Sequence, residues 1–269
     1  TTYKDLQFRL NCKTAETFGI KLPILFDDYS TKVGENGLDY YSDEEQQKVN
    51  SLSLETRFFH LELEFPQVFY DENGNKKIKP GFDCIIGNPP YVRQETIKEF
   101  KQHMQLSEQN SLGLKNFEIP SKSDLSCYFY YHGLNYLKDY GMLGFIASDG
   151  WMSHDYGKPM QQVMLNKCNI DTLMRTKFNV FGDADIKTIT TILQKIPNFT
   201  GSHSVKIFYA KNQEELESRQ EVEKITKQQN EVTPGNWNLY FTDNELQPKI
   251  KMTMMDKIGK VKFGKKTGM

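Results

Sequence analysis

Residues 82–92 read FDCIIGNPPYV, a short and mostly apolar run that stops at Gly87 and continues as Asn-Pro-Pro-Tyr. An apolar run of this length, bounded by Gly and Pro, is typical of a strand buried on both faces of a parallel sheet. The two prolines remove backbone donors and restrict the residues before them to extended conformations, so we expect the strand to end in a rigid loop. In an open α/β sheet, ligands bind beyond the carboxyl ends of the strands. The stretch therefore predicts both an α/β fold and a functional site at residues 88–91.

The flanking sequence supports that fold class. Strands are expected at 82–86, 142–148, 170–176, 187–194 and 205–209, and helices at 124–139, 159–168 and 213–229, the last of them very polar. Strands that alternate with helices indicate an α/β sheet with crossover connections, here ending in an antiparallel pair.

Composition excludes several other classes. The 269 residues carry a formal net charge of −1, so the whole chain is not a polycation built to bind nucleic acid. No apolar run is long enough to cross a bilayer, and no export leader begins the sequence. The four cysteines form no CxxC pair and the five histidines show no ligand spacing, which argues against a metal site or a disulfide framework. We therefore expect a reducing, cytoplasmic location.

The chemistry of the loop follows from its acceptors. The side-chain carbonyl of Asn88 and the backbone carbonyl of Pro89 can each accept a hydrogen bond, and the ring of Tyr91 offers a flat apolar face. Two acceptors beside a stacking surface suit a planar ligand that bears an exocyclic NH₂ group. Accepting both amine hydrogens favours the pyramidal amine, whose lone pair can attack an electrophilic methyl group. A base within a duplex would have to be flipped out to reach the loop.

NPPY after a hydrophobic strand resembles the catalytic motif of the adenine-N6 DNA methyltransferases. Further segments resemble large restriction–modification enzymes of type IIG, in the same order along the chain: 59–66, 124–129, 141–151 and 180–184. The resemblance implies the C-terminal half of a Rossmann-like sheet that uses S-adenosylmethionine (SAM), with double-stranded DNA as partner. By this resemblance Asn88 and Pro89 hold the amine, Tyr91 and Phe181 stack on the base, and Pro90 borders SAM.

The same resemblance predicts how the chain is divided. We expect a peripheral segment at 1–57, the catalytic half of the methyltransferase at 58–210, a polar connector helix at 211–245 and the start of a target-recognition domain at 246–269. Residues 245–269 are basic, with seven lysines against Glu245 and Asp256. The glycine-rich loop that binds SAM in this group is not recognisable before residue 88. The chain is therefore expected to be an incomplete fragment that is inactive on its own.

Two alternatives stay open. The same acceptors fit the amine of an RNA base or the side-chain amide of a protein glutamine. A module that binds DNA without catalysis could also have kept the loop as a scaffold. A glycine-rich SAM loop elsewhere in the protein would favour an enzyme, and methylation assays on DNA, RNA and protein would separate the substrates.

Overall fold

The described residues form one six-stranded sheet. The computed structural model describes residues 3–22, 41–92, 95–98, 101, 119–180, 187–197, 201–218 and 223–241. The strands are β1 (Phe82–Gly87), β2 (Leu137–Ser148), β3 (Cys168–Thr176), β4 (Thr188–Lys195), β5 (Ser204–Ala210) and β6 (Glu223–Gln228), in the order β1-β2-β4-β3-β5-β6. β1 runs parallel to β2, and β4 lies antiparallel between β2 and β3. β5 pairs parallel with β3 and antiparallel with β6.

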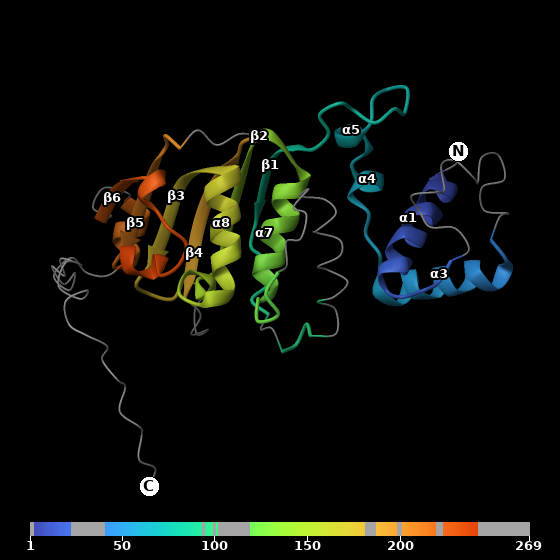
Figure 1. Cartoon of the computed structure of the whole chain (residues 1–269), viewed down its shortest axis with the longest axis horizontal. Helices are drawn as coiled ribbons and strands as arrows, with labels where there is room; N and C mark the ends of the chain where they lie inside the picture. The colour runs from blue at the N-terminus through green and yellow to red at the C-terminus, as the bar shows by residue number, and fades with distance from the viewer. Residues whose placement is uncertain are drawn as a thin grey trace, which may run out of the picture.

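Two crossover helices cover one face of this sheet. α7 (Leu125–Tyr136) connects β1 to β2, and α8 (Lys158–Lys167) connects β2 to β3; both lie on the same side of the strands (Figure 1). The predicted α/β sheet, with parallel crossovers followed by antiparallel pairing, is confirmed.

An aromatic core joins α7 to the sheet. Tyr130 of α7 is fully buried, and its hydroxyl lies 2.8 Å from Oγ1 of Thr191 on β4. Its ring meets the rings of Phe145 and Trp151 edge-on, at centroid distances of 5.2 and 5.8 Å. Trp151, in the 3-10 turn η2 (Gly150–Met152), in turn contacts Trp237 of η5 (Trp237–Phe241). These contacts fix the end of β2 relative to α7, which matters because the NPPY loop leaves the sheet beside it.

The first helices form a small unit with its own core. α1 (Tyr3–Thr17) packs against α3 (Asp43–Thr56), and the short helices α4 (Leu61–Glu64) and α5 (Pro66–Phe69) lead from this pair to β1 (Figure 1). The buried residues of the pair form a cluster separate from the core of the sheet: Phe8, Cys12, Ala15, Tyr41 and Val49.

The prediction that residues 82–86 are buried on both faces is wrong. β1 lies at the edge of the sheet, where Cys84 is exposed and Ile86 is 83% exposed. An edge strand has one neighbour, and the described helices over β1 lie on one side only. Side chains on its other face therefore reach solvent.

Two helix predictions also need correction. The helix predicted at 124–139 ends at Tyr136, because Leu137 is extended (φ −79°, ψ 142°) and buries its side chain as the first residue of β2. The polar helix predicted at 213–229, and with it the connector helix at 211–245, is wrong. Among the residues described there, α9 (Gln213–Ser218) is the one α-helix, and the strand β6 follows it. Pairing with β5, which sets Ile225 opposite Ile207, outweighs the local helix propensity. Residues 246–269 lie outside the described residues.

Candidate active site

The NPPY loop leaves the sheet at the carboxyl end of β1. Because β1 and β2 are parallel, this end lies beside the carboxyl end of β2, where Gly87 is paired with Phe145. A Cβ atom added to Gly87 would lie 3.1 Å from Cε1 of Phe145, so a glycine lets the last residue of the strand pack directly on that ring. In the loop itself Pro89 is buried and Asn88 is exposed. The loop thus has a fixed base and an accessible amide.

Asn88 and Tyr91 are joined by a hydrogen bond. The Tyr91 hydroxyl donates to Oδ1 of Asn88 at an O···O distance of 2.6 Å. Burial raises the pKa of Tyr91, so the phenol keeps its proton near neutral pH and remains a donor. A carbonyl oxygen has two acceptor positions, so this contact leaves one of them for another donor. The structure therefore adds a second feature to Tyr91 besides its predicted stacking face: its hydroxyl orients the amide of Asn88.

Asp124 anchors the chain that follows the loop. The backbone N–H of Leu125 donates to the carbonyl of Val92, which ties the exit of the loop to the first turn of α7. Asp124 is the N-cap of that helix, and its Oδ1 accepts from the amide of Cys127 at 3.3 Å. Its Oδ2 accepts from the hydroxyl of Tyr156 at 3.2 Å. The carboxylate therefore connects α7 to the segment after β2, and the backbone of Leu125 connects the loop to the same turn.

Replacing Asp124 by Ala is expected to lower the free energy of unfolding by about 1–2 kcal/mol, the usual cost of losing an N-cap side chain. Asp124→Asn keeps an acceptor for the helix N–H and should lose less. Urea denaturation of both variants measures the difference. The exposed Asp139 is the matched control, since Asp139→Ala should change stability by no more than about 0.5 kcal/mol. Equal stability of Asp124→Ala and wild type would contradict this anchoring role.

An ion pair braces the carboxyl ends of β2 and β3. Oδ2 of Asp149, directly after β2, lies 2.5 Å from an Arg175 guanidinium nitrogen, and both side chains are 17% exposed. Burial raises the pKa of Asp149, while Arg175 and Lys187 oppose that rise. The amide of Asp149 also donates to the carbonyl of Lys187. Asp149 thus contacts both ends of the connection between β3 and β4: its side chain pairs with Arg175 near the end of β3, and its backbone bonds Lys187 just before β4.

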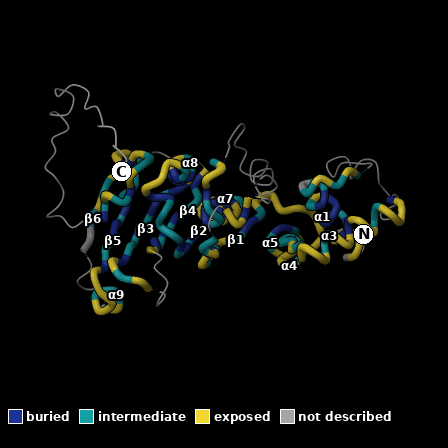
Figure 2. The backbone as a smooth tube through the Cα atoms, turned by 90° about the horizontal axis from the view of Figure 1, so that it is seen from below, coloured by how far each residue is buried: buried dark blue, intermediate teal, exposed yellow. Residues whose placement is uncertain are grey.

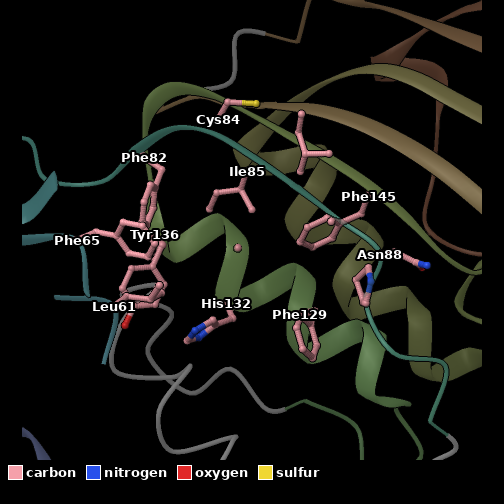
Figure 3. A pocket seen from close by; sticks show the side chains of 14 residues that line it. Leu61, Phe65, Phe82, Cys84, Ile85, Asn88, Phe129, His132, Tyr136 and Phe145 are labelled. Atoms are coloured by element: carbon pink, nitrogen blue, oxygen red, sulfur yellow. The ribbon is translucent and has the colours of Figure 1, made fainter. Parts of the chain in front are cut away.

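Beside the loop lies an apolar pocket of about 460 Å³ along the edge of β1. Most of its lining comes from apolar side chains of α4, β1 and α7, including Leu61, Phe82 and Phe129. In Figure 3 the amide of Asn88 lies at one end of this lining and points away from the apolar side chains. The pocket therefore borders the loop without containing the amide.

These residues fit SAM only in part. The lining includes Asn88, His132 and Tyr136 as polar residues, and no carboxylate that could hold a ribose or an ammonium group. The part of the chain that the structure describes contains no cluster of metal-ligating side chains and no helix able to span a membrane.

We therefore expect the isolated chain to bind SAM weakly or not at all, because the residues around Pro90 supply one edge of a pocket. Isothermal titration calorimetry measures this directly. A dissociation constant in the micromolar range would contradict the expectation.

The structure brings some of the predicted site residues together and does not describe others. It brings Asn88 and Tyr91 together at the end of β1, with Pro89 and Pro90 between them. Phe181 lies outside the described residues. Reasoning from sequence missed Asp124, Tyr156 and the Asp149–Arg175 pair. For Asp124 a signal was present, since an Asp before an apolar helical run is a common N-cap.

Fold and site together define an α/β domain that carries a rigid acceptor loop at the carboxyl end of a parallel strand. The model of the Eco57I restriction-modification methylase family matches residues 3–181, more than half of the chain, and the chain belongs to that family.

Two curated relatives are type II methyltransferases. The chain is 30% identical to M.BstVI of Geobacillus stearothermophilus over 105 residues, which is 38% of this chain and 17% of M.BstVI. It is 36% identical to M.XhoI of Xanthomonas vasicola over 83 residues, which is 31% of this chain and 14% of M.XhoI. The chain thus matches less than a fifth of the length of either relative.

Among solved structures the chain is similar to the type IIG restriction endonuclease BpuSI, with a TM-score of 0.44 and 12% identity over 58% of this chain and 21% of BpuSI. It is also similar to a type I methyltransferase subunit from Streptococcus thermophilus, with a TM-score of 0.38 and 23% identity over 52% of this chain and 28% of that one.

Proposed function

We propose that the chain is the catalytic part of an adenine-N6 DNA methyltransferase of a restriction–modification system, with SAM as methyl donor. The observation that carries the proposal is the hydrogen bond from Tyr91 to Asn88 in an accessible loop at the carboxyl end of β1. Membership of the methylase family and the two type II methyltransferase relatives support it.

The loop would act on the amine of a flipped base. Asn88 would accept one amine hydrogen with the lone pair that Tyr91 leaves available, and the backbone carbonyl of Pro89 would accept the other. The base would stack on Tyr91, with Phe181 assigned to its other face. Stacking of a base on an aromatic side chain is worth about 1–3 kcal/mol.

Both acceptors favour the transition state over the ground state. The amine lone pair is delocalised into the ring of the free base and becomes available as the nitrogen turns pyramidal. SAM, when bound, would supply the electrophilic methyl group and leave as the neutral thioether, and the methylated nitrogen would lose one proton to water. Acceptors held rigidly by two prolines need no rearrangement at that moment, which is how preorganised polar groups accelerate a reaction. No carboxylate base is required.

The test uses the protein expressed from the full reading frame that contains this chain. It is incubated with tritiated SAM in three separate reactions, which contain plasmid DNA, RNA or bacterial protein extract. We expect tritium in DNA only. Label in RNA or in protein would replace the proposed substrate by one of the alternatives. Binding of DNA without any label would favour a non-catalytic module.

A further inference from the structure

The segment that follows β2 lies beside the first turn of α7. Both crossover helices begin beyond the carboxyl ends of parallel strands, α7 after β1 and α8 after β2. The two helices lie next to each other on one side of the sheet (Figure 2). Tyr156 lies in the 3-10 turn η3 (Asp155–Gly157), directly before α8, and its hydroxyl reaches Asp124, directly before α7. One hydrogen bond thus joins the starts of the two crossover helices.

The two carboxylate oxygens of Asp124 bind different parts of the chain. Oδ1 accepts from the hydroxyl of Ser126 at 2.6 Å and from the amide of Cys127 at 3.3 Å, and both donors belong to α7. Oδ2 accepts from the hydroxyl of Tyr156 at 3.2 Å. Loss of the Tyr156 hydroxyl therefore leaves the cap of α7 in place and removes the link to the segment after β2.

The hydroxyl of Tyr156 is held at a defined position. The Tyr156 ring stacks on His154 at a centroid distance of 5.6 Å and an interplanar angle of 18°. A carbonyl oxygen can only accept, so Nδ1 of His154 donates to the carbonyl of Gly150, at 2.8 Å. A Cβ atom added to Gly150 would lie 2.7 Å from the Tyr156 hydroxyl oxygen. Burial raises the pKa of Tyr156, so the phenol keeps its proton and remains a donor.

We propose that Tyr156 is a positioning residue for the NPPY loop. Its hydroxyl holds Asp124 in place. The next residue, Leu125, donates its backbone N–H to the carbonyl of Val92, where the loop ends. The proposal rests on the proposed function, because the position of the loop affects a reaction rate only if Asn88 acts on a substrate. Polar groups accelerate a reaction when their supporting residues hold them at the productive geometry.

A hydrogen bond that only stabilised the fold would have a different effect. It would lower the fraction of folded protein, and with it the rate, by the same factor whether or not the Asn88 amide is present. Positioning acts through that amide, so its effect on the rate should disappear when the amide is removed. The two roles can therefore be told apart by kinetics.

Tyr156→Phe removes the hydroxyl and keeps the ring. In the protein expressed from the full reading frame, kcat for methyl transfer is expected to fall about three- to tenfold, the factor that corresponds to one net hydrogen bond, with KM for DNA unchanged. In an Asn88→Ala background, Tyr156→Phe should cause no further loss. Tyr140, which is 63% exposed, is the matched control, and Tyr140→Phe should keep the wild-type rate.

Gly150→Ala tests the same link from its other side. The added methyl group would meet the Tyr156 hydroxyl and displace it from Asp124, so kcat should fall as it does in Tyr156→Phe. Once the hydroxyl is absent, the end of the Tyr156 ring lies 3.9 Å from the added Cβ, which is an ordinary contact. The double variant should therefore be no slower than Tyr156→Phe alone.

Hydrogen exchange measures the link without any activity. The backbone amides of Val92 and Leu125 are both hydrogen-bonded where the loop ends. Tyr156→Phe and Gly150→Ala are expected to speed their exchange by about three- to tenfold in the same full-length protein, because the loop end opens more often. Mass spectrometry of the peptides that contain these residues measures the exchange. The control variant Tyr140→Phe should leave it unchanged.

The remaining outcomes decide between the two proposals. An unchanged kcat in Tyr156→Phe, or an equal loss with and without the Asn88 amide, would overturn the positioning role. Faster exchange in the variants of a wild-type protein that transfers no methyl group would keep the link and refute the proposed function. Methyl transfer by the wild type, with exchange unaffected by either variant, would keep the function and refute the link.

Discussion

Replacing Asn88 by Ala is expected to reduce the rate of methyl transfer about 10²–10³-fold, the effect of removing one preorganised polar group that stabilises a transition state. The loss should be in kcat rather than in KM for DNA, because the amide acts on the amine only as it turns pyramidal. Single-turnover kinetics with the protein in its full reading frame measures this rate.

The control must separate chemistry from folding. Asn88 is exposed, so its truncation should change the free energy of unfolding by no more than about 0.5 kcal/mol. Asn50, an exposed asparagine of α3, is the matched control, and Asn50→Ala should keep full activity. An Asn88→Ala protein that is folded and transfers methyl groups at the wild-type rate would refute the catalytic role of the amide.

The largest effect on stability is expected at Gln229. This side chain is 1% exposed and lies in the 3-10 turn η4 (Gln229–Glu231), after β6. Its Oε1 accepts from the amide of Ile170 at 2.9 Å, and its Nε2 donates to the carbonyls of Leu165 and Cys168 at 3.1 and 2.8 Å. The side-chain amide of Gln229 therefore bonds three backbone groups at the junction between α8 and β3.

Gln229→Ala leaves these three groups without their partner and is expected to lower the free energy of unfolding by about 3–5 kcal/mol. Gln229→Glu should also destabilise strongly, because a carboxylate would face two carbonyls. Urea denaturation measures both variants. Gln162, exposed on α8, is the control, and Gln162→Ala should cost less than about 0.5 kcal/mol. A loss below about 1 kcal/mol for Gln229→Ala would show that these bonds contribute little.

Local sequence was sufficient for the parts of the fold that short-range chemistry determines. The end of β1 at Gly87 and the loop after it follow from proline geometry, and the helix expected at 159–168 is present as α8. The exposure of one face of β1 could not be predicted in this way, because an edge strand and a central strand can have the same apolar sequence. The exposure of Ile86 depends on which elements lie next to it.

Long-range pairing explains the other differences. Residues 223–228 are as polar as a surface helix, and only pairing with β5 makes them a strand. In the site, Asn88 and Tyr91 were predictable from the motif, but the bond between them depends on side-chain rotamers. The Asp149–Arg175 pair joins the residue directly after β2 to a residue of β3, and β4 lies between these strands, so no local pattern indicates the pair.

Nucleoside analysis of methylated DNA tests the central claim most directly. DNA is incubated with SAM and the protein in its full reading frame, digested to nucleosides and analysed by mass spectrometry. The account predicts N6-methyladenine with wild type and none above background with Asn88→Ala. N4-methylcytosine, or N6-methyladenine formed equally well without the Asn88 amide, would contradict it.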